Sequence, residues 1–201
     1  MEESILRGIL EVKDGRIVNY KPGIGFMVVS VGAACNFKCR DCGSLCPYVQ
    51  SEYRRQDVES VIDDLKIFLD AVAVVRKLQI QGGEPFIYSD LDKLVDFVGN
   101  DDRVQRCIIA TNGSITPSDK LMSTLKKNDA EIRISNYNLF PEKIKRLEEK
   151  CDEFGIRHDT YNFTSGSAMW FDHGGVSQPP PVSRVSSRQK KNITAVEIAT
   201  A

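Results

Sequence analysis

The 201-residue sequence has no uninterrupted apolar run of the roughly 18 residues that a bilayer-spanning helix requires. It also lacks an excess of charge of either sign, with 27 basic and 28 acidic side chains and a formal net charge of −1. A protein that binds the phosphate backbone of a nucleic acid usually presents a cluster of basic side chains on one face. The balance of charges in this sequence therefore does not favour a nucleic-acid partner. Residues 1–4 carry no positive segment ahead of a long apolar run, so no secretory signal is expected. We therefore expect a cytoplasmic protein without a membrane segment.

Six cysteines are present, and we do not expect disulfides, because the cytosol keeps thiols reduced. Two of them, Cys107 and Cys151, stand alone within apolar patterns and are expected to be small core side chains. The other four share one segment of twelve residues: Cys35, Cys39, Cys42 and Cys46. Their spacing matters more than their number.

Strand-like and helix-like patterns alternate along most of the chain. Apolar runs predict five strands, at 24–31, 75–81, 106–111, 130–135 and 156–161. Apolar residues at helical spacing predict four helices between them, at 58–69, 91–98, 116–128 and 141–154. The third should be capped by Thr116 and have Pro117 at its first position. The alternation is typical of β-α-β units, so we expect an α/β fold with a parallel sheet.

The composition changes at both ends of this alternation. Residues 8–20 predict a β-hairpin around an Asp14-Gly15 turn, and we assign 1–23 to an N-terminal hairpin extension. Residues 24–173 form the expected core domain. Residues 174–201 contain three consecutive prolines, four serines and four basic side chains against one acidic one. With few apolar groups to offset the entropy of ordering, this tail is expected to be disordered.

The segment Cys35-Asn36-Phe37-Lys38-Cys39-Arg40-Asp41-Cys42 follows directly on the first core strand. Its loop is expected at the carboxyl end of the sheet, where α/β folds place their sites. Three thiolates at this spacing can hold three irons of a [4Fe–4S] cluster and leave the fourth iron open. With Cys46 as a fourth ligand, the segment instead makes a closed zinc site or an electron-transfer cluster. The cysteines alone leave both interpretations open.

A second motif, Gly82-Gly83-Glu84-Pro85, follows the second core strand and joins two glycines to a carboxylate. Together with the cysteine spacing, it resembles the radical S-adenosylmethionine (radical SAM) superfamily. The resemblance covers roughly residues 25–161 and implies a partial (β/α) barrel of about five β/α units. The complete family core has six units, and a sixth strand is not evident here, although 167–172 is a candidate substitute.

The resemblance implies two cofactors, a [4Fe–4S] cluster and S-adenosyl-L-methionine. It assigns the metal to Cys35, Cys39 and Cys42. The implied cofactor-binding residues lie at three strand tips: Gly82, Gly83, Glu84, Pro85, Asn112 and Ser135. Gly82, Gly83 and Glu84 are expected to contact the methionine amino group, and the other two tips the ribose and carboxylate. Relatives carry an aromatic residue just before the third cysteine, where this chain has Asp41, so adenine packing stays unassigned.

The implied activity is that of a radical SAM enzyme. One electron from the reduced cluster cleaves S-adenosylmethionine into methionine and a 5′-deoxyadenosyl radical, which abstracts hydrogen from a substrate. These motifs bind the cofactor that the whole family shares, so they do not identify the substrate. The substrate can be a small molecule, a peptide or a protein. The family also implies an electron donor such as flavodoxin or ferredoxin. The alternative is an iron–sulfur binding protein, or an inactive homologue with an incomplete barrel.

Overall fold

The computed structural model describes residues 9–39, 42–163 and 196–197, and its centre is one sheet in the strand order β10-β4-β6-β7-β8-β9. Five neighbouring strands run parallel: β4 (Met27–Ser30), β6 (Leu78–Gln81), β7 (Cys107–Thr111), β8 (Glu131–Asn136) and β9 (His158–Asn162). The predicted α/β fold with a five-strand parallel sheet is therefore confirmed. Within the described residues the sheet stays open, as in a partial barrel.

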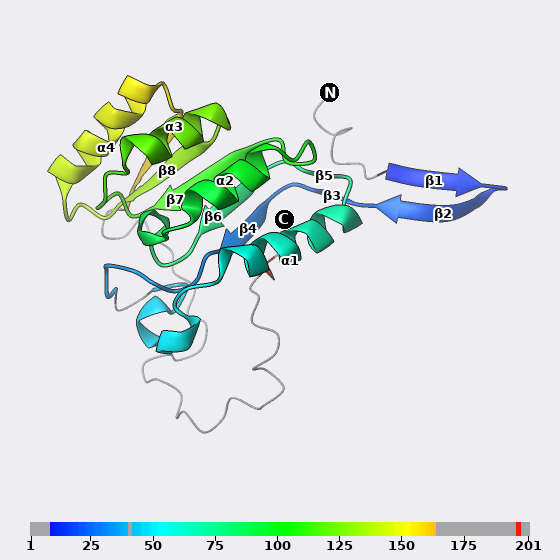
Figure 1. The fold of residues 1–201 in the computed structure, drawn as a ribbon, viewed down its shortest axis with the longest axis horizontal. Coiled ribbons are helices and arrows are strands. Elements are labelled where there is room, and N and C mark those ends of the chain that lie inside the picture. Colours follow the sequence, from blue (N-terminus) through cyan, green and yellow to red (C-terminus); the bar gives the residue numbers. More distant parts are fainter. Residues whose placement is uncertain (1–8, 40–41, 164–195, 198–201) are drawn as a thin grey trace.

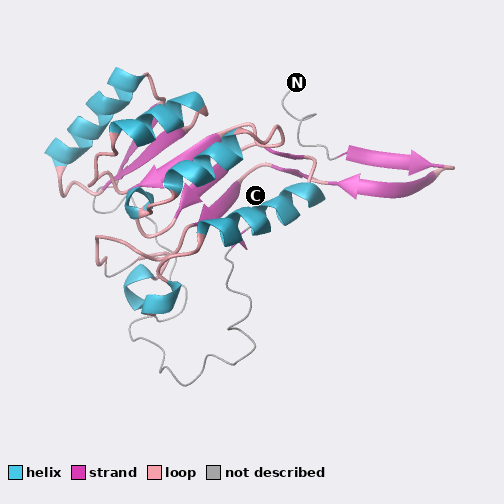
Figure 2. Ribbon diagram, viewed as in Figure 1, coloured by secondary structure: helices cyan, strands magenta, loops and turns pink. Residues whose placement is uncertain are grey.

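Four helices alternate with these strands: α1 (Val58–Ala71), α2 (Leu91–Gly99), α3 (Asp119–Lys127) and α4 (Pro141–Phe154). Figures 1 and 2 show all four on one face of the sheet. Their apolar stripes, with Leu65 and Leu94 among the fully buried side chains, pack against alternate strand residues such as Ile132 and Ile134. The hydrophobic core lies between the helices and this face, and Cys107 and Cys151 belong to it as predicted.

Two predicted strands are each divided in the structure. In place of the strand predicted at 24–31 the structure has β3 (Gly23–Ile24) and β4, and in place of the strand predicted at 75–81 it has β5 (Val74–Val75) and β6. β3 and β5 pair parallel in a small separate sheet. At the break, Arg76 N donates to the Ile24 carbonyl (2.8 Å) and Met27 N to the Lys77 carbonyl (2.9 Å). The two segments thus stay paired through an irregular step that hydrophobicity does not reveal.

The third helix begins later than predicted. Ser118, not Thr116, is its N-cap, with extended backbone (φ −68°, ψ 156°) and a hydroxyl that accepts from Leu121 N at 3.3 Å. Pro117 therefore precedes the helix instead of opening it. Threonine and serine are both favourable N-cap residues, so the sequence alone does not distinguish Thr116 from Ser118 as the N-cap.

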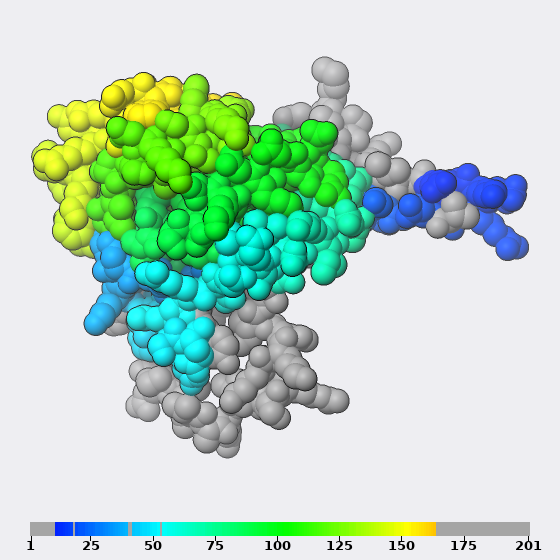
Figure 3. Space-filling model, in the orientation of Figure 1, coloured from blue at the N-terminus to red at the C-terminus, as the bar shows by residue number. Residues whose placement is uncertain are grey.

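The predicted hairpin is present as β1 (Ile9–Lys13) and β2 (Arg16–Lys21). Asp14 and Gly15 at its turn have φ of 51° and 74°, as two-residue turns of this hand require. Figure 3 shows the hairpin projecting from the body of the molecule. The boundary that we drew after residue 23 stays a prediction.

Near the C-terminus, β10 (Val196–Glu197) pairs antiparallel with Val28 and Val29 of β4. The rest of the predicted tail, and the candidate strand at 167–172, lie outside the described residues, so disorder after residue 174 stays a prediction. Among the helices that the structure describes, none is long and apolar enough to cross a membrane.

Candidate functional site at the carboxyl end of the sheet

The cysteine motif lies in the connection from β4 to α1, beyond the carboxyl end of β4. Cys35 and Cys42 are half-buried, whereas Cys39 is exposed. Cys46 is buried at the start of the 3-10 helix η1 (Cys46–Tyr48). At the base of the loop, Ala34 N donates to the Arg54 carbonyl (2.7 Å), which ties both ends of the connection together.

Gly82 and Gly83 lie against the backbone of the cysteine loop. Gly83 N donates to the Gly32 carbonyl (2.9 Å), and Glu84 N donates to the Ala34 carbonyl (2.8 Å). A Cβ atom on Gly83 would come within 2.2 Å of the Ala34 oxygen and 2.6 Å of the Cys35 Cβ; on Gly82 it would come within 2.6 Å of the Gly32 oxygen. Only glycine permits this approach. The glycine pair therefore allows the backbone before Cys35 to pack directly against the turn that follows β6.

Glu84 is a buried carboxylate that joins two strand tips. Its Oε1 accepts from Phe86 N (3.0 Å) and Thr111 Oγ1 (2.7 Å), and its Oε2 accepts from Asn112 N (2.8 Å). Burial raises its pKa, although these three donors act in the opposite direction. The bond to Phe86 N also caps the 3-10 helix η3 (Pro85–Ile87), whose first residue, Pro85, is buried. Among the described residues no Lys or Arg pairs with Glu84, so its donors are all neutral.

Asn112 links the tip of β7 to the cysteine loop. Its Nδ2 donates to Asn36 Oδ1 (3.0 Å) and lies 3.9 Å from Cys35 Sγ, which also accepts from Phe37 N at 3.3 Å. Its Oδ1 accepts from Ser114 N at 2.9 Å, and Asn36 Nδ2 donates to Ser114 Oγ at 2.8 Å. Cys35 is thus held by the β7 tip as well as by its own loop.

Ser135 lies apart from this network, half-buried near the carboxyl end of β8. The Ser135 side chain is close enough to Tyr137 to oppose the increase in the pKa of its phenol. Burial raises the pKa of Tyr137, and negative charge on Cys39, Cys42 and Cys35 adds to the increase, so this phenol is within electrostatic reach of the thiols. In the part of the chain that the structure describes, Ser135 itself makes no hydrogen bond to the cysteine loop.

The thiols influence one another. Burial is the main cause that raises the pKa of Cys35 and of Cys39, and charge on neighbouring thiols raises both further. Cys42 differs, because a hydrogen bond from the Cys46 thiol lowers its pKa to about 6 and raises that of Cys46. Three thiolates here repel each other, a situation that bound cationic iron relieves.

The donor set fits a metal cluster by its chemistry. Soft thiolates are the ligands of iron–sulfur clusters, and backbone and amide N–H groups already point at Cys35 Sγ, as such clusters require of their surroundings. Within residues 9–39 and 42–163, no three His, Cys, Asp or Glu side chains are gathered closely enough to hold a metal ion. Cys35 is half-buried and its Sγ accepts from two N–H groups, whereas Cys39 is exposed.

A cavity of about 560 Å³ opens beside Cys35. It is lined by Ala34, Cys35, Ser51, Glu52, Arg54, Arg55 and Ile87. Of the residues that the sequence singled out, only Cys35 lines it. Asn112 and Ser135 do not line it.

Four site residues were missed in the sequence. Thr111 holds Glu84, Asn36 and Ser114 connect the cysteine loop to the β7 tip, and Tyr137 lies near the thiols. Asn36 could have been identified from the sequence, because an amide side chain between two cysteines of a metal motif can hydrogen-bond to a neighbouring strand tip. The other three lie at the ends of β7 and β8, Thr111 as the last residue of β7 and Ser114 and Tyr137 in the loops that follow these strands, and they come near the cysteine loop only through tertiary structure.

No family profile matches this sequence. It is 32% identical over 139 residues to the GTP 3′,8-cyclase 3 of Mycobacterium bovis, covering 66% of this chain and 36% of that protein. It is 27% identical over 130 residues to the GTP 3′,8-cyclase of Helicobacter pylori, covering 63% and 39%. The chain thus spans well under half the length of these relatives. A crystal structure of BtrN in complex with AdoMet and 2-DOIA has a TM-score of 0.48 at 19% identity and covers 69% of this chain and 56% of that one.

The two sequence relatives are radical SAM enzymes. This chain carries a cysteine triplet after the first core strand and a Gly-Gly-Glu turn after the second, and direct backbone hydrogen bonds join the turn to the cysteine loop. On these grounds the chain belongs to the radical S-adenosylmethionine superfamily, whose cofactors are a [4Fe–4S] cluster and S-adenosylmethionine.

Proposed function

We propose that this chain is the core of a radical SAM enzyme, with Cys35, Cys39 and Cys42 as the three ligands of a [4Fe–4S] cluster. The chemistry supplied there is the reductive cleavage of S-adenosylmethionine into methionine and a 5′-deoxyadenosyl radical, which takes a hydrogen atom from a substrate. The observation that carries the proposal is the docking of Gly83 and Glu84 onto the backbone of the cysteine loop. Two motifs that are 40 residues apart in sequence, from Cys42 to Gly82, are thus brought together by backbone hydrogen bonds.

The chain's own residues divide the remaining work. Asn112 and the Phe37 amide donate toward Cys35 Sγ and thereby orient that ligand and stabilise negative charge on it. Cys46 donates to Cys42 and favours its thiolate, the form that binds metal. Cys46 is thus assigned a supporting role and not a fourth ligand.

Gly82, Gly83 and Glu84 are proposed to receive the methionine amino group. Glu84 supports this assignment because it is a buried carboxylate with only neutral hydrogen-bond donors, so a cationic group has no competing partner there. Pro85 starts η3 and sets the direction of the turn. Asn112 and Ser135 are proposed to contact the ribose and carboxylate, Asn112 through atoms that it now uses to hold Asn36 and Ser114.

We further place the protein in the cytoplasm, with a flavodoxin or ferredoxin as electron donor. The six cysteines are free of disulfides, which suits a reducing compartment. The site residues serve the shared cofactors, so the substrate, whether small molecule, peptide or protein, is not assigned from them.

The test is anaerobic reconstitution of the full 201-residue chain, followed by reduction with dithionite in the presence of S-adenosylmethionine. About four irons and four sulfides per chain are expected, with slow formation of 5′-deoxyadenosine measured by mass spectrometry. Glu84→Ala should reduce 5′-deoxyadenosine formation while iron content stays near that of the wild type. Glu131→Ala, at the opposite end of the sheet, is the matched carboxylate control and should leave product formation unchanged.

A fully loaded, reducible cluster that yields no 5′-deoxyadenosine contradicts the proposal. If the electron paramagnetic resonance spectrum of the reduced cluster also ignores S-adenosylmethionine, the chain is an iron–sulfur binding protein without radical chemistry.

A further inference from the structure

The face of the sheet opposite the helices is polar. Because side chains alternate along a strand, burial of Ile132 and Ile134 under the helices turns Glu131, Arg133 and Ser135 to the other face. Figures 1 and 2 show no helix on that side among the described residues. A polar row crosses it from β6 to β9: Gln81, Gln79, Arg133 and Tyr161.

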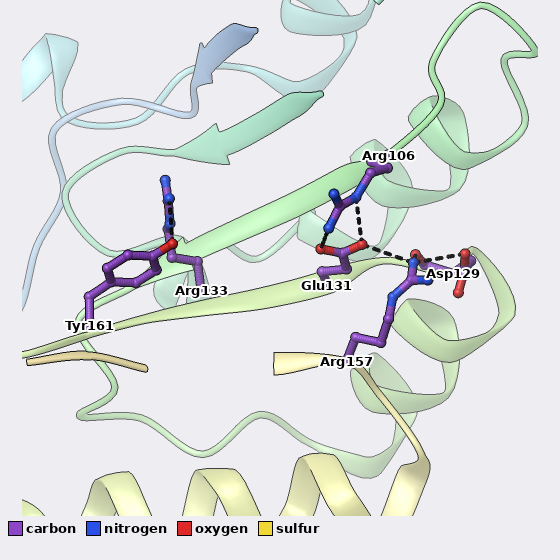
Figure 4. A network of polar contacts seen from close by, with 6 residues as sticks. All are labelled: Arg106, Asp129, Glu131, Arg133, Arg157 and Tyr161. Carbon is purple, nitrogen blue, oxygen red and sulfur yellow. Dashed lines mark hydrogen bonds and ion pairs between the residues drawn. The ribbon is translucent and has the colours of Figure 1, made fainter. Parts of the chain in front are cut away.

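Arg133 is the centre of this row. Its Nη1 donates to Gln79 Oε1 (3.0 Å) and its Nη2 to the Tyr161 hydroxyl (3.0 Å), and its Cζ lies 4.5 Å from the centroid of the Tyr161 ring. Figure 4 shows the side chain standing off β8 beside Tyr161. Its register partner on β7 is Ala110, whose small side chain leaves room for the guanidinium to reach Gln79 on the next strand. Gln79 is itself buried and oriented by Gln81.

The partners of Arg133 are all neutral, which distinguishes it from the other arginines in Figure 4. Arg106 and Arg157 both pair with Glu131, and Arg157 also pairs with Asp129 at 2.9 Å. Arg133 forms no ion pair within the described residues, even with Asp159, its register partner on β9, whose side chain is exposed on the same face. A guanidinium has five N–H donors, and only two are used here. A positive charge is therefore held in a fixed orientation and not neutralised.

The position of Arg133 relates it to the candidate site. It lies two residues before Ser135 on the same strand face, a separation of about 7 Å. Ser135 is near the carboxyl end of β8, and the cysteine loop follows the carboxyl end of the parallel strand β4. Arg133 therefore lies on the strand face that leads to Ser135 at the carboxyl end of β8, two residues from a proposed cofactor contact.

We propose that Arg133 binds the phosphate or carboxylate group of a small-molecule substrate, with Gln79 and Tyr161 fixing its guanidinium. This rests on the proposed function, because the substrate is the one that the radical chemistry acts on. A planar, half-buried guanidinium already held by two side chains loses little freedom when an anion binds, and can donate to it bidentately.

The test is a titration of the full chain, labelled with [¹⁵N]arginine, with inorganic phosphate and separately with acetate, followed by the Arg133 side-chain NMR signal. A saturable shift is expected with at least one of the two anions, and it should persist when S-adenosylmethionine is saturating. Arg133→Gln should weaken anion binding at least tenfold, whereas Arg133→Lys retains part of it. Arg106→Gln is the matched control and should leave anion binding unchanged, because Arg106 is already paired with Glu131.

Absence of a saturable shift in the wild-type protein overturns the inference, whether or not the variants fold. Loss of the shift on addition of S-adenosylmethionine also overturns it, because Arg133 then holds the carboxylate of that cofactor. The two proposals fail separately. A chain that binds phosphate but makes no 5′-deoxyadenosine contradicts only the enzymatic function, and one that makes 5′-deoxyadenosine without binding either anion contradicts only the anion site.

Discussion

The two ends of the parallel sheet each contain a buried or half-buried carboxylate, but the partners of the two carboxylates differ in charge. At the amino end, Glu131 is paired with the guanidinium groups of Arg106 and Arg157. At the carboxyl end, Glu84 accepts only from neutral donors, Thr111 Oγ1 and two backbone amides. The first arrangement satisfies its charge and ties three strands together. The second arrangement leaves the Glu84 carboxylate without a cationic partner, so a cationic ligand can neutralise it. The thiols of the neighbouring cysteine loop likewise have no cationic partner among the described residues.

The largest effect that tests this contrast concerns the thiols. Replacing Cys35, Cys39 or Cys42 by alanine should abolish the intact cluster, measured as iron and sulfide content after anaerobic reconstitution, because each supplies one iron ligand. Cys46→Ala, Cys107→Ala and Cys151→Ala should retain it. If Cys46→Ala loses the cluster as completely as Cys39→Ala, the carboxyl end holds a closed four-thiolate site and the open-iron proposal fails.

The next effect concerns backbone contact at the carboxyl end. Gly83→Ala places a Cβ atom 2.2 Å from the Ala34 oxygen, so the cysteine loop must move. We expect the free energy of unfolding to fall by about 3 kcal/mol, as for other overpacked positions, and iron content to fall below half of the wild-type value. Gly15→Ala, in the hairpin turn with no heavy atom within 4 Å, is the control. It should cost about 1 kcal/mol through its positive φ and leave the iron content unchanged.

A direct comparison of the two carboxylates follows. Glu84→Ala leaves the Thr111 hydroxyl and the Asn112 amide without their acceptor in a buried setting, and should lower the free energy of unfolding by about 2 kcal/mol. Glu131→Ala should cost about 1 kcal/mol, because its arginine partners are more exposed to water. Both are measured by urea denaturation. Equal losses would show that the two ends do not differ in this way.

The smallest effect is expected at the C-terminal tail. A chain ending at His173 should keep its cluster and lose less than about 1 kcal/mol of stability, because the tail has little apolar surface to contribute. Amide exchange should find residues after 174 unprotected, apart from slight protection at Val196 and Glu197, which pair with β4. Strong protection across 182–198 would instead show that the tail contributes more than the two residues of β10 to the folded core, and the domain boundary at 173/174 would be wrong.

Much of the fold was predictable because it follows from local periodicity. The stripe on α1 and the continuous apolar run of β7 each indicate one kind of element, and their order along the chain predicts a parallel sheet. The start of α3 was misplaced because Thr116 and Ser118 are similar caps locally. The division of the first strand into β3 and β4 was missed because the break depends on pairing with β5 and β6.

The sequence by itself determined which residue types the candidate site contains, since the spacing of three cysteines and a Gly-Gly-Glu turn can be read without coordinates. Tertiary structure alone decided that Asn112 reaches Cys35 and that Glu84 is buried among neutral donors. It also decided that Arg133 has neutral partners while Arg106 and Arg157 share Glu131. The physical reason is that a motif records ligand type and spacing along one chain segment, whereas burial and charge pairing depend on which strands lie side by side.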